Sequence, residues 1–402
     1  RWREKSVLAE GKWVKIRVPE EGIYQLTESD IQKMGFTSLD KVKVYGYGGL
    51  LQNEAFAFPN ADERMLQTHT PDDLEEVPTL PTSDGRKLFW AEGTVRYKWN
   101  SGTQRYTHVQ NHYSNYSYYF LTEGEAPSTV QQLPEISLDE ASAILEEVPA
   151  IAVYENDTYS WYSGGRSMFD SHDFSTNSVF SYRLTLPQMS ANGTKTVEVR
   201  MGASAKGTTS PFNLSLNGTK LGTFSVNGYD ESIASAKAEL FTFNRVTTLQ
   251  PDVSNIFQFT SQSNHSARLD YIRVNYTRQL SIVDTPYSFS PQKTGTVALQ
   301  VRNASSSSHV WRIGQPGNPT AEVPSICSAD GVLTAVTSTP VRRFVCFDEK
   351  KNYASPEYVE DVANQNLHGQ NPVDYIIIVP ASGKLVEQAE RLLKLHNDRS
   401  GL

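Results

Sequence analysis

The feature that most constrains the fold is an uninterrupted apolar run near the carboxyl end of the chain, residues 375–379 (Tyr-Ile-Ile-Ile-Val), between Asp374 and Pro380. A strand stays apolar at consecutive positions when both faces of its sheet are covered, as in the parallel sheet of an α/β domain. The run therefore predicts a central strand of such a sheet.

Residues 383–396 follow this run with the period of an amphipathic helix. One side of the helix would carry Leu385, Val386, Ala389, Leu392, Leu393 and His396, with Glu and Lys opposite. A parallel strand needs a neighbour that the chain reaches through such a crossover helix, and the sequence stops where that neighbour would begin. We therefore expect the α/β domain to continue beyond residue 402, in a longer parent protein of which this chain is the amino-terminal part.

Length and composition predict several mainly β domains before this segment. The chain has 402 residues, more than one hydrophobic core usually fills. It contains 20 Tyr, 17 Phe and 6 Trp, which pleated sheets favour. A net charge of -8, with no basic run longer than Arg342-Arg343, argues against nucleic acid or an anionic membrane surface as a partner.

The sequence also indicates a trimmed or processed start and no membrane helix. No stretch approaches the roughly 20 consecutive apolar residues that such a helix needs. The chain starts at Arg1 without Met or an apolar signal core, which is typical of a chain whose signal peptide has been removed or of a trimmed start.

Alternating apolar and polar positions, interrupted by turn residues, divide the chain into segments. We predict an N-terminal β domain over 1–121, an acidic connector over 122–150, a jelly-roll-like β-sandwich over 151–282, a third β segment over 283–352 and the start of the α/β domain over 353–402. The predicted fold class is thus mainly β and multi-domain, ending in the first strand and helix of an α/β domain.

Short motifs refine this outline. Residues 27–35 carry N-cap and terminal-Gly signals and predict a short helix, and residues 137–145 predict another in the connector. The glycines within 46–49 are typical of a turn or bulge, because no Lys-Ser/Thr pair follows them as a phosphate-binding loop requires.

Asn-Gly pairs mark two further turns. Asn217-Gly218 and Asn192-Gly193 each predict a two-residue hairpin turn. The triplets that begin at Asn192, Asn217 and Asn275 also match N-glycosylation acceptors, although turn chemistry generates such triplets by chance in a β protein. Both interpretations stay open.

The two cysteines are too few for a disulfide framework. Cys346 lies in the apolar run 344–347, where we interpret it as a buried thiol that acts as a small hydrophobe. A disulfide with Cys327 and a catalytic pair with His368 are the alternatives. Apolar surroundings raise the pKa of a thiol, which disfavours the catalytic alternative.

The eight histidines are spread singly along the chain. His108 and His112 have a zinc-chelating spacing on a helix, but strand-like residues follow them, and on a strand they would lie about 13 Å apart. We interpret His172, beside Asp173, as a loop residue bonded to its neighbours. Because neither Gly-x-Ser-x-Gly nor His-Glu-x-x-His occurs, we predict no catalytic residue, metal site or cofactor within this chain.

Aromatic and small polar residues alternate over 159–169. Trp161, Tyr162 and Arg166 are therefore candidate contact residues for a glycan or a partner chain at the rim of the sandwich. Packing between neighbouring parts of the chain explains the same pattern, and it is the interpretation that we favour.

Several runs of residues resemble the type IX secretion sortases, a family related to the gingipain cysteine peptidases. The most specific run is 362–369 (Val-Ala-Asn-Gln-Asn-Leu-His-Gly), followed by 374–380 and 388–396, which are similar to the start of the family's peptidase domain. Upstream, residues 11–16, 22–24, 44–49, 105–108, 118–120 and 269–275 are similar to earlier landmarks, so the resemblance covers nearly the whole chain.

Two positions depart from the family pattern. Val-Trp-Asp of the family is Val310-Trp311-Arg312 here, and Ser-Gly-Arg followed by an aromatic residue is Ser-Gly-Gly-Arg-Ser at 163–167. The first departure replaces an acid by a base, so the contact that the acid makes is not expected in this chain.

The resemblance implies that the α/β part is a caspase- or gingipain-like peptidase domain whose catalytic His and Cys follow its first strand and helix, outside residues 1–402. The parent would be a cell-surface, outer-membrane cysteine endopeptidase that removes C-terminal sorting domains from exported cargo and attaches the cargo to anionic lipopolysaccharide. This chain would be inactive alone and would need no cofactor. Its partners would be its own C-terminal peptidase domain, cargo proteins with C-terminal sorting domains, other proteins of the secretion complex, and lipopolysaccharide or another glycan.

A second class of function stays open from the residues alone. A jelly-roll-like sandwich could bind surface glycans or act in adhesion, with Trp161 and Tyr162 as the groups that stack on sugar rings.

Overall fold

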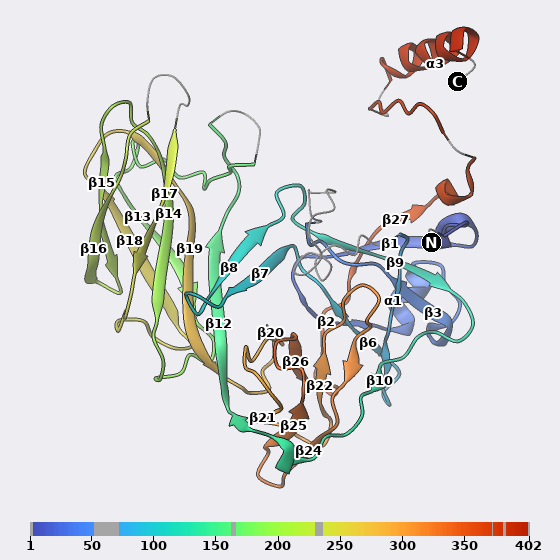
Figure 1. Ribbon diagram of the computed structural model, residues 1–402, viewed down its shortest axis with the longest axis horizontal. Coiled ribbons are helices and arrows are strands. Elements are labelled where there is room, and N and C mark those ends of the chain that lie inside the picture. Colours follow the sequence, from blue (N-terminus) through green and yellow to red (C-terminus); the bar gives the residue numbers. More distant parts are fainter. Residues whose placement is uncertain are drawn as a thin grey trace.

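The computed structural model describes residues 3–51, 72–161, 166–229, 236–371, 373–380 and 383–400. These residues form mainly β-strands, which confirms the predicted fold class. Figure 1 shows three groups of sheets and, at the upper right, a carboxyl-terminal helix that stands apart from them. We call the three groups the first body, the sandwich and the third body.

The first body consists of two sheets around one core. The larger sheet has the order β27 (Glu357–Val362), β1 (Trp13–Val18), β9 (Ser117–Glu123), β3 (Val42–Tyr45) and β4 (Glu76–Val77), and the smaller one the order β2 (Gly22–Leu26), β6 (Lys87–Ala91) and β5 (Leu80–Pro81). The 3-10 helix η1 (Val7–Ala9) precedes β1 in the sequence, and the 3-10 helix η2 (Leu39–Lys41) directly precedes β3. Alternate residues of β1, Val14, Ile16 and Val18, are fully buried in the core, as the period of a strand requires.

Helix α1 (Glu28–Lys33) confirms the short helix predicted in this region. The Thr27 hydroxyl accepts a hydrogen bond from the backbone N–H of Asp30, and the Asp30 carboxylate accepts one from the backbone N–H of Thr27. This reciprocal capping box fixes the start of the helix.

The sandwich packs two four-stranded sheets face to face (Figure 1, left). Their orders are β12 (Glu147–Glu155), β19 (Ser266–Gln279), β14 (Thr196–Ser204), β17 (Lys237–Phe243), and β13 (Val179–Thr185), β18 (Ser254–Ser261), β15 (Ser210–Leu216), β16 (Thr219–Val226). Phe212, Leu214 and Leu216 of β15 alternate into the common core. A hairpin of β7 (Val95–Asn100) and β8 (Arg105–Gln110) lies between the first body and the sandwich.

The third body is a second, smaller pair of sheets. Their orders are β10 (Gln131–Gln132), β23 (Ala321–Glu322), β22 (Ser308–Arg312), β26 (Phe344–Asp348), β20 (Ser288–Phe289), and β11 (Ala143–Leu145), β21 (Val297–Val301), β25 (Leu333–Thr337), β24 (Ser325–Cys327). Cys346 lies in the core between these sheets, and Cys327 is packed against that core; both are free thiols. The interpretation of Cys346 as a buried thiol is confirmed, and the alternative disulfide is not formed.

The first and third bodies share an apolar core. Leu88 and Trp90 of β6 pack with Trp311 of β22 and with Val345 and Phe347 of β26. One face of the β22–β26 pair therefore completes the third body, and the other face is buried against the first body.

A partly buried ion pair network lies at the rim of this shared core. The Arg343 guanidinium donates two hydrogen bonds of 2.8 Å to the Glu92 carboxylate and one of 2.6 Å to Glu21. Burial raises the pKa of Glu21, and Arg343 only partly offsets this effect. Burial alone would lower the pKa of Arg343, but the charges of Glu92 and Glu21 have the larger combined effect and raise it.

The predicted helix over 137–145 is wrong. Only the single turn of the 3-10 helix η3 (Leu138–Glu140) forms there, and the following residues form strand β11, which pairs in parallel with β21. Ser137 and Glu140 form a capping box, which favours the start of a helix. The helix does not continue because the next backbone groups form hydrogen bonds with β21 instead.

Two further local predictions have different outcomes. Asn217 and Gly218, with positive φ of 52° and 81°, join β15 to β16 in a tight turn, as predicted. The hairpin turn predicted at Asn192-Gly193 is wrong, because the strands on either side of it, β13 and β14, belong to opposite sheets of the sandwich.

The predicted boundary at residue 353 is corrected by β27. Residues 357–362 pair with β1 at the edge of the first body rather than with an α/β sheet. Arg17 of β1 reaches across to Glu357 at 2.8 Å, which adds a charge pair to the backbone ladder. Strand β27 therefore belongs to the amino-terminal sheet, and the carboxyl-terminal segment begins after it.

The carboxyl-terminal segment contains one of its two predicted elements. Helix α3 (Val386–Ser400) confirms the amphipathic helix. Residues 374–380 are not a strand, because no other strand among the described residues lies beside them to accept their hydrogen bonds. Ile376 and Ile378 are instead 75% and 93% exposed. None of the helices in the described ranges is both long and apolar enough to cross a membrane.

We predict that Arg343→Ala destabilises the chain by about 2–4 kcal/mol, because it leaves two carboxylates without their counter-charge in a partly buried site. Urea unfolding measures the change. The control is Arg302→Ala, which removes an exposed pair with Glu146 and should cost about 0–1 kcal/mol. Equal effects of the two substitutions would contradict the assigned role of Arg343.

Candidate functional site

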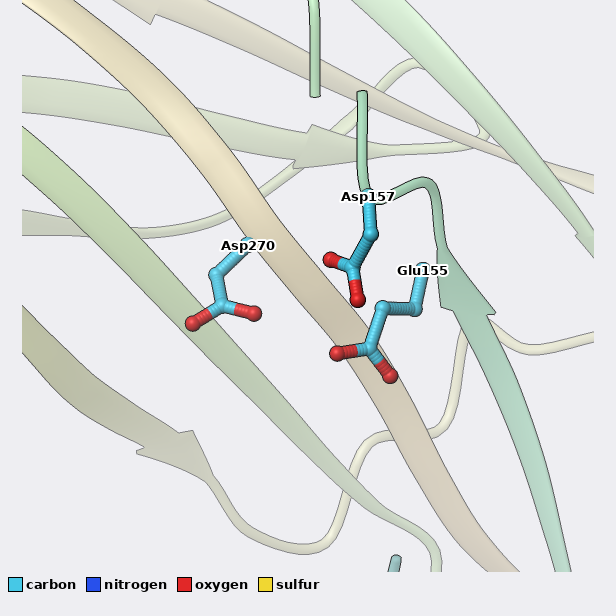
Figure 2. A group of neighbouring side chains, drawn as sticks. All are labelled: Glu155, Asp157 and Asp270. Atoms are coloured by element: carbon cyan, nitrogen blue, oxygen red, sulfur yellow. The ribbon is translucent and has the colours of Figure 1, made fainter. Parts of the chain in front are cut away.

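Three carboxylates converge where the β7–β8 hairpin meets the sandwich. Glu155 is the last residue of β12, Asp157 follows two residues later, and Asp270 lies on the neighbouring strand β19. One oxygen of each lies within 4.8 Å of the others, and Figure 2 shows the three side chains directed toward a common centre. We call this group the carboxylate cluster.

An arginine and a histidine contact the carboxylate cluster. Arg200 of β14 forms an ion pair with Asp270. His108 of β8 contacts Glu155 through Nε2 at 2.8 Å, and its Nδ1 lies 3.2 Å from an Arg273 nitrogen. Because a guanidinium can only donate, these contacts match the tautomer in which Nδ1 accepts from Arg273 and Nε2–H donates to Glu155.

The environment shifts two of the carboxyl pKa values toward neutrality. Burial and the nearby charge of Glu155 raise the pKa of Asp157 to about 6. Burial raises the pKa of Asp270, which is 3% exposed, to about 7, although Arg200 acts in the opposite direction. One Asp157 oxygen is buried and has no hydrogen-bond partner among the described residues. The cluster can therefore retain a proton near neutral pH, and its oxygen atoms are of the type that binds a hard divalent cation.

The hairpin is held against the sandwich by a second set of contacts. The Asn275 side chain accepts a 2.7 Å bond from the Tyr106 backbone N–H and donates a 3.1 Å bond to the Tyr106 carbonyl. The Asn275 triplet has a structural explanation, because this side chain is buried and bonds the hairpin to the sandwich. Asn217 likewise donates to Thr248 and Asn255.

The three candidate contact residues have different surroundings. Trp161 is half-buried and packs edge-on against Phe169, with ring centroids 4.6 Å apart, and over Gly202 of β14. Arg166 is exposed, and Tyr162 lies outside the described residues. Trp161 thus packs against neighbouring residues of the sandwich, and a role in contact with a glycan or a partner chain stays a prediction.

The remaining candidates do not converge on a site. His112 lies beyond the end of β8 beside Tyr113 and does not meet His108. His172 contacts the carbonyl of Asn177 at 3.1 Å, as expected of a loop residue. His368 is placed near Asp72 and Asp73 in the first body, away from Cys346 in the core of the third.

Burial raises the pKa of Cys346, so its thiol is unsuited to nucleophilic attack. The carboxylate cluster could not be predicted from the sequence, because Glu155 and Asp157 lie at and just after the end of β12, far in sequence from Asp270 of β19. The only local signal was the pair Glu155 and Asp157, separated by a single residue.

Comparison with solved structures places this architecture in a known fold. The crystal structure of dimeric latent PorU from Porphyromonas gingivalis matches with a TM-score of 0.80 and 23% identity, over 100% of this chain and 37% of that chain. This chain thus spans a little over a third of the length of the PorU chain that it matches. It has the fold of that part of PorU, which confirms the resemblance to the sortases at the level of the fold.

Other similarities are far weaker. A family 35 carbohydrate-binding module from Clostridium thermocellum matches with a TM-score of 0.20 and 15% identity, over 31% of this chain and 90% of that chain. A CBM35 module from Cellvibrio japonicus Abf62 matches with a TM-score of 0.21 and 14% identity, over 33% and 96%. These values carry no argument about function. No family model and no curated protein matches the sequence.

The packing of Trp161 yields a test of its role. We expect Trp161→Ala to lower the free energy of unfolding by about 1–3 kcal/mol through lost packing. Gly202→Ala should also destabilise, since a Cβ atom would lie 2.6 Å from the Phe169 ring and 2.9 Å from the Trp161 ring. Tyr113→Ala, at a residue that is 73% exposed, is the control and should change little. Unchanged stability of Trp161→Ala, together with lost binding on a glycan array, would favour a sugar-stacking role.

The raised carboxyl pKa values predict the pH dependence of stability. A carboxyl with a higher pKa in the folded than in the unfolded chain contributes stability at low pH, and this contribution is lost as pH rises through the folded-state value. For Asp157 and Asp270 this loss of stability takes place between about pH 4, near their unfolded-state pKa, and about pH 7. We expect the free energy of unfolding to fall between pH 5 and pH 7.5 in EDTA, and the Asp270→Asn variant to lose much of this dependence.

Asp84→Asn is the matched control, because hydrogen bonding to Arg86 lowers the pKa of Asp84 to about 2, outside this window. The same titration with millimolar Ca²⁺ shows whether the carboxylate cluster holds only a proton or can also bind a divalent cation. A bound cation would cancel the decrease in stability as the pH rises. An increase in stability across the window in EDTA would contradict the assigned environments.

Proposed function

We propose that this chain is the non-catalytic amino-terminal region of a PorU-like cysteine peptidase at the cell surface. The observation that carries the proposal is the likeness to PorU over the whole chain at a TM-score of 0.80. Because the matched region is 37% of that structure, the proposed parent has a peptidase domain beyond this region. Its proposed activity is the removal of C-terminal sorting domains from exported cargo.

Exposed apolar side chains support a packing surface toward that peptidase domain. Ile376 and Ile378 project from the segment before α3, and Leu385, Leu392 and Leu393 at or near α3 are also exposed. Contiguous exposed apolar residues mark surfaces that another body covers. We infer that residues 374–380 become a strand only when the sheet of the peptidase domain supplies neighbouring strands.

The anchoring of residues 364–368 supports a scaffold rather than a free linker. The backbone N–H of Gln365 donates to the Leu8 carbonyl at 3.1 Å, and the Asn366 side chain accepts from the Ser6 backbone N–H at 2.9 Å. The Asn364 amide donates to the carbonyls of Leu8 and Gly11. Residues 364–366, part of the run that resembles the sortases, thus bond to the amino-terminal segment. This contact would fix where the peptidase domain begins.

The internal cysteine and histidine support a non-catalytic role. Cys346 is buried in an apolar core with a raised pKa, and His368 lies beside two aspartates of the first body. The proposed nucleophile therefore belongs to the peptidase domain of the parent. Contacts with cargo, with other secretion proteins and with lipopolysaccharide belong to the same proposal.

Substitution of an exposed isoleucine tests the proposal. Ile378→Asp should leave the stability of the 402-residue chain unchanged within about 0.5 kcal/mol, because the side chain is exposed. In the full-length parent the same substitution should lower the melting temperature and the cleavage of a cargo protein with its sorting domain, because the charge would enter an apolar sheet.

The matched control is Val253→Asp in the sandwich, at another exposed aliphatic residue, which should leave cleavage unaffected. Activity assays on the isolated chain complete the test, and we expect no peptide hydrolysis. Hydrolysis by this chain that disappears in Cys346→Ala would overturn the proposal.

A further inference from the structure

Two arginines of the third body are brought together at the end of one strand pair. Arg312 is the last residue of β22, and its register partner in β26 is Phe344. Arg342 lies two residues before Phe344, in the turn that leads into β26, and the Ile313 backbone N–H donates to the Arg343 carbonyl at 2.9 Å. The backbone therefore places both arginines at the same end of two adjacent strands, where both are half-buried.

Both guanidinium groups are held by uncharged partners from a single hairpin turn. Arg312 donates to the Asn318 side-chain oxygen at 3.1 Å, and Arg342 donates to the Gln315 side-chain oxygen. Gln315 and Asn318 lie opposite each other, joined by two backbone hydrogen bonds of 2.8 Å. The turn thus orients the two cations side by side without neutralising them.

The charge of this pair is uncompensated within the described part of the chain. Burial and the neighbouring charge of Arg342 lower the pKa of Arg312. No carboxylate of a described residue forms a salt bridge with either arginine, whereas Arg343 and Arg273 each contact a carboxylate. Two like charges held together in a partly dry site repel each other, and a bound anion would relieve that repulsion.

We propose that Arg312 and Arg342 form a binding site for a phosphate group, either free or carried on a saccharide. Each guanidinium has five N–H donors, and one side-chain acceptor among the described residues contacts each, so both retain donors for a ligand. A tetrahedral oxyanion has enough oxygen atoms to accept from two guanidinium groups at once, whereas a carboxylate matches the fork of one. This site is independent of the packing role proposed above.

Phosphate titration of the intact chain at constant ionic strength tests the site. We expect inorganic phosphate to raise the melting temperature and to give a saturable calorimetric signal, whereas chloride at equal ionic strength does neither. Arg312→Gln and Arg342→Gln should each weaken phosphate binding at least about tenfold, as expected for a charged hydrogen-bond donor. Arg302→Gln, at an exposed arginine paired with Glu146, is the matched control and should bind phosphate as the unmodified chain does.

Two further measurements keep the proposal falsifiable. In phosphate-free, low-salt buffer, Arg312→Gln should retain or gain thermal stability, because it removes one of two repelling charges; a clear loss would make the pair a structural contact and overturn the proposal. Glucose 6-phosphate binding more tightly than inorganic phosphate would identify a saccharide-borne group, and the reverse order a free ion. Equal binding by the unmodified chain and the double variant would overturn the proposal in either case.

Discussion

The contact of Arg343 with Glu21 and Glu92, at the rim of an apolar core shared by two bodies, is the interaction on which the rest of the arrangement depends. It joins Glu21 and Glu92 of the first body, which precede the sandwich in the sequence, to Arg343 of the third body, which follows it. Charges in such a place favour one relative orientation, because any displacement would leave a carboxylate unpaired. The return of β27 to the first sheet adds a second link between the ends of the chain.

These links make the carboxyl-terminal segment project from a defined point. The first body is closed by strands from both ends of the chain, and the run 364–368 is bonded to residues 6–11. Beyond that point the apolar side chains of 374–380 are exposed, and α3 stands apart from the sheets (Figure 1). A linked set of β-sheets followed by an exposed apolar segment is the arrangement expected of a scaffold that supports a further domain.

Local sequence signals were reliable where neighbours in sequence are neighbours in space. The Asn217-Gly218 turn and the short helix α1 depend on interactions within a few residues, and both were predicted. Asn192-Gly193 and residues 137–145 carried the same kinds of signal, yet pairing with distant strands decided their structure. The carboxylate cluster and the Arg312–Arg342 pair could not be predicted, because Asp270 of β19 and Arg342, just before β26, reach their partners only through strand pairing.

The sequence by itself determined the mainly β class, the sandwich strands and the amphipathic helix, because alternation and helical period are properties of consecutive residues. It also carried the sortase resemblance that the fold supports. Only the tertiary structure decided that residues 357–362 belong to the first sheet, that Trp161 is packed, and that acids and arginines gather into clusters. The physical reason is that strand pairing and charge environments are set by contacts across long sequence separations, which a single sequence does not specify.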